Sequence, residues 1–149
     1  MKGYEFCRLL SSETWGIRAA VLWPEKAPGP ECKLDADDQE GTFHFGVKHQ
    51  SRVVSVGTFL PQEHPELNAA DYRLRAMATD VDFRNKGVGR ALILGAMAEL
   101  QAHSVKGVWA DARHSALGFY ARLDWEVTGP SYEVPKRGLH RLVWAGIGK

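Results

Sequence analysis

The chain has 149 residues, 44% of them hydrophobic and 25% charged, which is usual for one globular domain, so we expect residues 1–149 to form a single domain. Its formal net charge of +1 offers no bulk attraction to nucleic acid or to a membrane surface. Cys7 and Cys32 lack the spacing of a disulfide framework or a metal site, so we predict no metal and a reducing, cytoplasmic location. No apolar run is long enough for a signal core or a membrane helix.

The first third of the chain predicts a strand, a helix and a long loop. Tyr4 to Leu10 has a weak strand alternation, and Ser11 or Ser12 can cap a following helix that Pro24 ends. The stretch 24–41 is rich in proline, glycine and acidic residues, which predicts a loop with at most a short helical turn. We interpret this loop as a solvated connector, and the alternative is a mobile flap over a substrate cleft.

The middle of the chain predicts a hairpin and a further strand. Residues 42–48 alternate, with phenylalanine and valine on one face and His44 on the polar face, so we expect a half-buried strand. Residues 53–60 are apolar on both faces and predict the partner strand of a hairpin. Residues 72–79 predict the next strand. The helix predicted at 88–102 is apolar almost all round, which is typical of a buried helix.

The remaining residues predict alternating short elements. We expect strands at 108–112, 125–128 and 139–145, a helix capped by Ser115 that extends to Leu123, and a turn-rich arm at 131–138 after Gly129-Pro130 ends the second of these strands. The resulting order is strand, helix, loop, three strands, helix, strand, helix and two strands. It predicts an α/β sandwich of the α+β type with a mixed sheet.

One stretch between a strand and a helix is suited to an anion. In Arg84-Asn85-Lys86-Gly87-Val88-Gly89, two glycines stand where the chain turns into the helix, and glycine permits positive φ and close approach of a ligand. The first turn of a helix has free N–H groups and the positive end of the helix dipole. With Arg90 adding a third nearby positive charge, the stretch predicts a seat for a phosphate or pyrophosphate.

The spacing within this stretch separates the possible phosphate ligands. The P-loop pattern is absent, since Arg90 follows Gly89, and the dinucleotide pattern lacks its third small residue, since Leu92 stands there. Arg84-x-x-Gly87-x-Gly89 instead resembles the coenzyme A pyrophosphate loop of the GNAT family of N-acetyltransferases. The resemblance implies a mostly antiparallel mixed sheet with helices on both faces, and a fourth and fifth strand splayed around the cofactor.

Three other stretches are similar to the same family. Leu74 to Thr79 resembles the strand whose backbone pairs with the pantetheine arm beside a β-bulge. Ala116, Phe119 and Tyr120 match the family's second half, whereas Asp111, Asp124 and Trp125 depart from its usual Asn, Gly and Phe. The segment 129–142 resembles a C-terminal arm of some small bacterial members.

The resemblance implies an N-acetyltransferase that moves the acetyl group of acetyl-CoA to a primary amine by direct attack. Backbone amides near Met77 and Ala78 would polarise the thioester carbonyl, and Tyr120 would be the general acid at the sulfur. The implied cofactor contacts are Met77, Ala78, Thr79, Arg84, Asn85, Lys86, Gly87, Val88, Gly89 and Arg90.

Several alternatives remain open at this level. The general base can be His44, Glu63, His64, His140 or a water. A longer acyl donor, an acceptor that is either a small amine or a peptide N-terminus, and a homodimer are all compatible with the sequence. The alternative function is a non-catalytic module of the same fold that binds or senses acetyl-CoA or another acyl-CoA.

Overall fold

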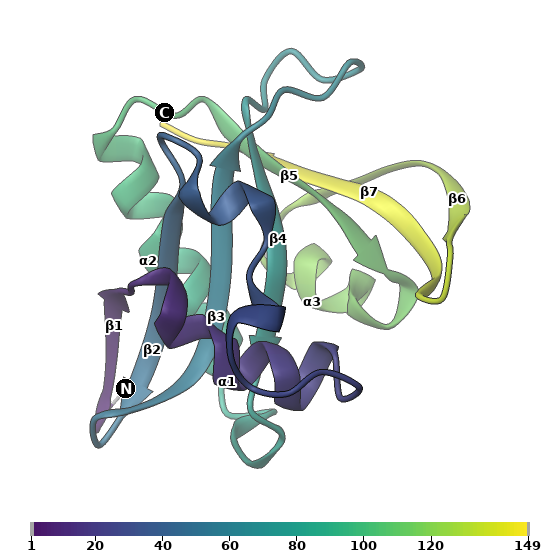
Figure 1. The fold of residues 1–149 in the computed structure, drawn as a ribbon. Coiled ribbons are helices and arrows are strands. Elements are labelled where there is room, and N and C mark those ends of the chain that lie inside the picture. Colours follow the sequence, from purple (N-terminus) through teal and green to yellow (C-terminus); the bar gives the residue numbers. More distant parts are fainter. Residues whose placement is uncertain (1, 149) are drawn as a thin grey trace. The chain divides into compact units, whose positions relative to one another are not determined.

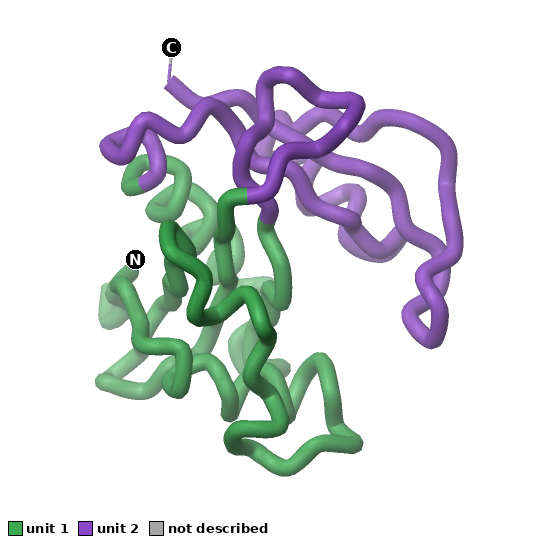
Figure 2. Tube along the Cα trace, turned by 45° about the horizontal axis from the view of Figure 1, so that its top comes forward, with its two compact units in different colours: residues 1–61, 74–99 green, residues 62–73, 100–149 purple. Residues whose placement is uncertain are grey.

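The computed structural model describes residues 2–148, which form two compact units (Figure 2). Unit 1 consists of residues 1–61 and 74–99, and unit 2 of residues 62–73 and 100–149. Seven strands are hydrogen-bonded in the order β1-β2-β3-β4-β5-β7-β6. None of the helices within residues 2–148 has the length and apolar character that a bilayer crossing requires.

The elements follow the predicted order (Figure 1). The strands are β1 (Tyr4–Arg8), β2 (Phe43–His49), β3 (Arg52–Pro61), β4 (Tyr72–Thr79), β5 (Gly107–Arg113), β6 (Glu126–Val134) and β7 (Gly138–Gly146). The α-helices are α1 (Trp15–Ile17), α2 (Val88–Ala102) and α3 (Leu117–Arg122). Short 3₁₀ turns stand at Ser11–Thr14, Pro30–Cys32, Asp35–Asp38, Val81–Phe83 and His114–Ala116, and Arg18–Leu22 is a π-helical turn.

Unit 1 is built on the predicted hairpin. β2 and β3 pair antiparallel from Phe43↔Phe59 to His49↔Arg52, and β1 pairs antiparallel with β2. Gln50 (φ 50°) and Ser51 (φ 70°) both adopt left-handed conformations, which give a two-residue turn the twist of its flanking strands. Within this unit α1 lies on one face of β2 and β3 and α2 on the other, so helices cover both faces (Figure 1).

Two predictions about burial in unit 1 are wrong. β2 is buried on both faces rather than one, and His44 is only 6% exposed. Helix α2 buries Leu92, Ile93 and Leu100, but Leu94 is 51% exposed, so the helix is amphipathic and not buried all round. In β2 the second face is covered by the connector, which the alternation of a strand cannot indicate.

Most of the connector at 24–41 is exposed, as expected for a solvated loop, but Cys32 and Asp37 are buried and anchor it in unit 1. Cys32 is fully buried, and the Asp37 carboxylate accepts two hydrogen bonds, of 2.7 and 2.9 Å, from the fully buried guanidinium of Arg18. Ser11 does not cap a helix as predicted, because its hydroxyl donates to Asp37 (2.9 Å). Burial alone would raise the pKa of Asp37, but the bonds from Arg18, the Leu34 amide and Ser11 lower it.

His44 completes this buried cluster. Its Nδ1 lies 2.9 Å from the Thr58 hydroxyl and its Nε2 3.3 Å from the Asp37 carbonyl oxygen. The carbonyl can only accept, so Nε2 carries the proton of the neutral ring. Arg18 donates to the same Thr58 hydroxyl (2.8 Å) and to the Cys32 carbonyl (2.9 Å). Burial lowers the pKa of His44, and the positive charges of Arg18 and Arg8 lower it further, against the opposing effect of Asp37.

Unit 2 differs from the predicted elements at β6. β6 runs from Glu126 to Val134, straight through Gly129-Pro130, and its pairing with β7 shifts register between Thr128 and Tyr132. A proline can stand in a strand at such a bulge because it has no N–H to offer the ladder there. The predicted arm at 131–138 is therefore mostly strand, and its turn is confined to 135–137.

Helix α3 also begins differently from the prediction. Its N-cap is Ala116 and not Ser115, and a 3₁₀ turn precedes it. β5 pairs antiparallel with β7 along its whole length, from Gly107↔Gly146 to Arg113↔His140. The parallel contact of β5 with β4 consists of Tyr72↔Val108 and Arg73↔Trp109, four residues that all belong to unit 2.

Candidate active site

The predicted anion seat is a tight, exposed turn in unit 1. Asn85 (φ 61°) and Gly87 (φ 80°) both take left-handed conformations, and helix α2 follows at once. The Gly87 carbonyl accepts the Ala91 amide (3.0 Å), which makes Gly87 the residue that leads into the helix. The amides of Val88, Gly89 and Arg90 are then the first three of the helix, which have no partner within it.

The shape and charge of this turn fit a phosphate. A Cβ built on Gly87 would meet no atom within 4 Å, so the space above the turn is open. Arg84, Lys86 and Arg90 are exposed around it. Asp80 accepts the Asp82 amide (2.9 Å) and pairs with Arg52 (2.5 Å). The Asp80 carboxylate is thus paired with Arg52 and not with the basic residues of the loop.

Strand β4 carries the second group of predicted cofactor residues. Ala76 has φ 53°, a left-handed conformation within a strand, and this turns the peptide groups that follow it. Ala78 is buried against Leu9, Ile17 and Val56, and its carbonyl accepts the Ser55 hydroxyl (3.2 Å). Met77 and Thr79 are partly exposed. The bulge-like irregularity implied by the family resemblance is therefore present one residue before Met77.

Tyr120, the candidate general acid, is a buried residue of unit 2. Its ring contacts Phe119 edge-on (centroids 5.1 Å apart) and Trp125 (5.0 Å). Burial raises the pKa of the Tyr120 phenol, so the group stays protonated at neutral pH. A proton donor requires this state, and a general base would require the opposite.

The four side chains considered as general base lie in different surroundings. Both ring nitrogens of His44 are engaged in the buried cluster of unit 1, which leaves it no free lone pair. Glu63 is exposed on the loop between β3 and β4. His64, on the same loop, accepts the Glu66 amide at Nδ1 (3.1 Å) and packs edge-on to Trp109 (4.8 Å).

His140 presents the opposite arrangement. Its Nδ1 lies 2.9 Å from the Gly138 carbonyl, so Nδ1 is the donor and the neutral ring carries its lone pair on Nε2. The ring also stacks against Tyr132, with centroids 6.4 Å apart. His44 and His140 are both buried, and of these two His140 is the one whose neutral ring keeps a basic nitrogen.

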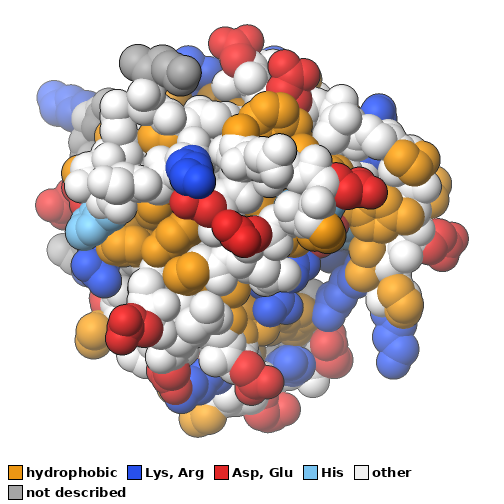
Figure 3. Space-filling view, turned by 90° about the horizontal axis from the view of Figure 1, so that it is seen from above, with side chains coloured by type: hydrophobic (Ala, Val, Ile, Leu, Met, Phe, Trp, Pro, Cys, Tyr) orange, Lys and Arg blue, Asp and Glu red, His pale blue; other side chains and the backbone are white. Residues whose placement is uncertain are grey.

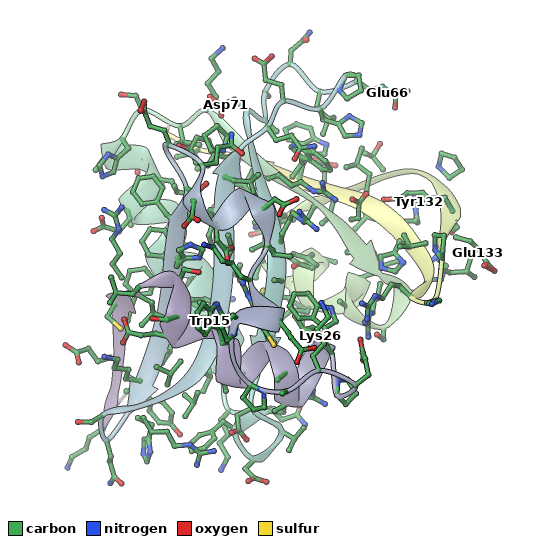
Figure 4. The ribbon with its side chains drawn as sticks, viewed as in Figure 1. Trp15, Lys26, Glu66, Asp71, Tyr132 and Glu133 are labelled. Carbon is green, nitrogen blue, oxygen red and sulfur yellow. The ribbon has the colours of Figure 1, made fainter. Side chains whose placement is uncertain are left out.

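The loop between β3 and β4 borders a cavity of about 550 Å³ within unit 2. Glu63, His64, Asp71 and Lys106 are among the residues that line it. Asp71 lies at its base (Figure 4), where its Oδ1 accepts the Lys106 (2.9 Å) and Gly107 (3.3 Å) amides. Through Oδ1, Asp71 thus holds the loop on the start of β5.

Sequence reasoning missed a polar network in unit 2 that is centred on Asp111. Arg73 donates to Asp111 (2.7 Å), and the Tyr132 hydroxyl donates to its other oxygen. The Arg73 guanidinium lies over the Trp109 ring, 4.8 Å from its centre. Alternation along β5 places Trp109 and Asp111 on one face and was visible in the sequence. The approach of Tyr132 depends on the register of β6 and β7, which no local pattern discloses.

Comparisons with known proteins agree on one family. The sequence model described as Acetyltransferase (GNAT) family matches residues 6–125. The uncharacterized N-acetyltransferase YitI of Bacillus subtilis (strain 168) is 37% identical over 133 residues, which cover 89% of each chain.

Solved structures share the fold at lower identity. The ribosomal-protein-S18-alanine N-acetyltransferase from Escherichia coli superposes with a TM-score of 0.74 at 16% identity, covering 98% of this chain and 95% of that one. An aminoglycoside 6'-N-acetyltransferase complexed with coenzyme A has a TM-score of 0.75 at 11% identity, with 97% and 98% covered. The predicted fold class is confirmed by these neighbours. With the family model spanning most of the chain and YitI similar over 89% of it, the chain belongs to the GNAT family of acyl-CoA-dependent acetyltransferases.

Proposed function

We propose that this chain is an acetyl-CoA-dependent N-acetyltransferase that acts on a primary amine, with residues 1–149 working as one catalytic domain. The observation that carries the proposal is found in unit 1. Strand β4 has its left-handed residue at Ala76, and the open turn with left-handed Asn85 and Gly87 follows on the same chain segment, at the start of α2. Together they offer backbone groups for a pantetheine arm and for a pyrophosphate.

Each group has a defined task in the proposed reaction. Amides from Asn85 to Arg90 hold the pyrophosphate, and main-chain groups of Met77 and Thr79 align the pantetheine arm. An amide at or near Ala78 polarises the thioester carbonyl, where preorganised donors contribute several kcal/mol in comparable sites. The amine nitrogen attacks the carbonyl carbon, the bond to sulfur breaks, and Tyr120 gives its proton to the sulfur. The amine's proton leaves to water or to Nε2 of His140.

The acceptor needs a separate argument. The two solved neighbours are named for acceptors as different as an alanine of a ribosomal protein and an aminoglycoside. A shared fold does not select between such acceptors, because specificity resides in side chains at the site.

Two glycine variants test the cofactor seat. Gly87→Val puts a side chain into the open space above the turn and should abolish acetyl-CoA binding. Gly129→Val is the matched control, since Gly129 (φ 75°) is also left-handed and also has nothing within 4 Å of its Cβ. Both variants place a valine at a left-handed glycine position and so carry similar backbone strain. A difference in acetyl-CoA binding between them therefore reports on the cofactor seat and not on strain. Binding is measured by calorimetry and by the rise in Tm with acetyl-CoA.

Equal acetyl-CoA affinity in the Gly87→Val and wild-type proteins would contradict the assigned seat. A second measurement addresses the alternative function of a binding or sensing module. The wild-type protein is incubated with acetyl-CoA and a panel of primary amines, and release of the coenzyme A thiol is followed. An enzyme releases thiol in an amine-dependent way, whereas a sensor binds acetyl-CoA and releases none.

A further inference from the structure

One face of the unit 2 sheet brings together an arginine, an aspartate, a tyrosine and two tryptophans. Arg73 is the pairing partner of Trp109 across β4 and β5, and Asp111 follows two residues later on the same face. Across β5 and β7, Trp109 pairs with Trp144 and Asp111 with Leu142. Tyr132 comes from β6 (Figure 4) and reaches Asp111 through its hydroxyl.

Several hydrogen-bond donors of this group are engaged within unit 2. Arg73 directs Nη2 to Asp111 (2.7 Å) and Nη1 to the Gln62 side-chain oxygen (3.4 Å), and its Nε is buried. The Trp109 indole N–H donates to the Gln62 carbonyl (2.7 Å). Tyr132 uses its single hydroxyl proton on Asp111. Burial and the bond to Asp111 raise the pKa of the Tyr132 phenol, so this proton is kept at neutral pH.

The group also has hydrogen-bond acceptors that remain open to a ligand. The Asp111 side chain is 28% exposed, and a carboxylate has about four lone-pair sites, of which Arg73 and Tyr132 use two. The Tyr132 oxygen, having donated its proton, can only accept. The free acceptor sites of Asp111 and Tyr132 are complementary to a group that presents donors alone, and an ammonium is such a group.

We propose that Asp111 is the acceptor-binding carboxylate of this enzyme, held in place by Arg73 and Tyr132, and that the acceptor is a cationic primary amine with an apolar body. The apolar part would lie on Leu142 and Trp144, the neighbours of Asp111 and Trp109 on β7. This inference rests on the proposed function. Arg73 offsets part of the charge of Asp111, and the bound ammonium must give a proton to water or to Nε2 of His140 before its nitrogen can attack a thioester.

The acids of the connector are poorer candidates for the same role. Asp37 is fully committed to Arg18, Ser11 and the Leu34 amide. Asp38 pairs with Lys33 (2.5 Å). Asp37 cannot receive an amine without losing an existing partner. The Asp38 side chain is 67% exposed, so an amine bound there would stay largely in water, whereas the Asp111 side chain is 28% exposed.

The test measures binding without catalysis, using phenethylamine and its neutral counterpart phenethyl alcohol. Affinities are taken from NMR titrations that follow the Trp109 indole N–H, which reports on this face and not on overall stability. We expect the wild-type protein to bind the amine at least about tenfold more tightly than the alcohol, which corresponds to one charge-assisted hydrogen bond. Asp111→Asn keeps the shape and removes the charge, and should reduce this preference to near unity.

Asp124→Asn is the matched control, because it removes the same charge from an exposed aspartate of unit 2. An unchanged preference in Asp111→Asn, an equal loss in Asp124→Asn, or equal binding of amine and alcohol to the wild-type protein would overturn the proposal. Tyr132→Phe provides a second reading if Asp111→Asn does not fold, since it should also lower the preference several-fold.

Acetyl-CoA titrations of the same proteins separate this proposal from the proposed function. Acetyl-CoA binding and amine-dependent thiol release, without any amine preference that depends on Asp111, would refute the acceptor site alone. An Asp111-dependent amine preference without acetyl-CoA binding would refute the acetyltransferase function alone.

Discussion

Tyr120 is both a packed aromatic residue of unit 2 and the proposed general acid. It packs between Phe119 and Trp125, and burial keeps its phenol protonated. Phe in its place would fill nearly the same volume, so the fold should be insensitive to the change. The chemical step should be sensitive to the change, because Phe has no hydroxyl proton to give to the leaving sulfur.

Tyr120→Phe should therefore lower kcat by about 100-fold or more, the usual range for a general acid, and leave acetyl-CoA affinity unchanged. Tyr4→Phe is the control, since the Tyr4 ring packs against His49 in unit 1 and has no assigned part in proton transfer. Steady-state kinetics of thiol release with calorimetry of acetyl-CoA binding give the two numbers. If kcat stays at the wild-type value, Tyr120 has no part in proton transfer.

At the scale of elements, helix α2 depends on a glycine that is unrelated to the cofactor turn. A Cβ on Gly95 would lie 2.5 to 2.8 Å from three ring atoms of Phe6, which packs from β1. In a solvent-exposed helix, alanine is preferred to glycine by about 1 kcal/mol. Here the overlap should reverse that preference, because either the Phe6 ring or the helix must move.

Gly95→Ala should accordingly lower the free energy of unfolding by about 1–3 kcal/mol. Gly16→Ala in α1 is the comparison, since a Cβ there meets nothing within 4 Å, and it should be neutral or stabilising. Urea unfolding of both variants gives the values. A Gly95→Ala protein as stable as wild type would mean that α2 and β1 are not packed as closely as described.

The secondary-structure elements show which parts of the fold could be predicted from the sequence. Local signals were enough for β2–β3, β4, α2 and the turn at Gly87, because periodicity and glycine placement act over a few residues. Local signals failed where the burial or the end of an element depends on residues that are distant in the sequence. His44 looked like a polar-face residue because its neighbours Asp37 and Thr58 come from other elements. Gly129-Pro130 looked like a strand end because the bulge that accommodates it depends on pairing with β7.

The same limit applied to the candidate site. Its backbone part, from Met77 to Arg90, is one continuous segment and could be predicted from its motif. The Arg73–Asp111–Tyr132 group could not be predicted, because it is assembled from β4, β5 and β6. Its contacting residues are 21 and 38 positions apart in the sequence.

For the molecule as a whole, stability should depend on pH through His44. An unfolded histidine titrates near 6.5, and the pKa of His44 in the folded protein is lower. As pH falls below about 6.5, the unfolded chain takes up a proton that the folded chain refuses. The contribution of His44 is thus complete above pH 6.5 and is lost toward its folded pKa. Asp37, whose pKa is lowered from 3.8, acts only in a more acidic range.

His44→Gln should therefore show a flatter fall in the free energy of unfolding between pH 6.5 and 5 than the wild type does, a difference of at most about 1.4 kcal/mol per pH unit. His114→Gln, which changes an exposed histidine, should follow the wild-type curve. Denaturant titrations at several pH values provide the comparison. Parallel curves for His44→Gln and the wild type would show that His44 is not buried in its neutral form.

The surface of the whole molecule carries both signs of charge. Both Lys and Arg and Asp and Glu side chains are present on the face seen in Figure 3. A net charge of +1 adds little long-range steering, so an anionic cofactor is attracted chiefly by the basic residues of its own turn.

The fully buried Arg18 has a consequence for the order in which the chain folds. Its Nη1 and Nη2 atoms donate to groups 14, 19 and 40 residues farther along: the Cys32 carbonyl, the Asp37 carboxylate and the Thr58 hydroxyl. A cation cannot leave water before its partners are in place, because an unpaired buried charge is strongly unfavourable. Residues 30–38 should thus dock only after the β2–β3 hairpin has positioned Thr58, so that the connector is ordered late in folding although it lies early in the sequence.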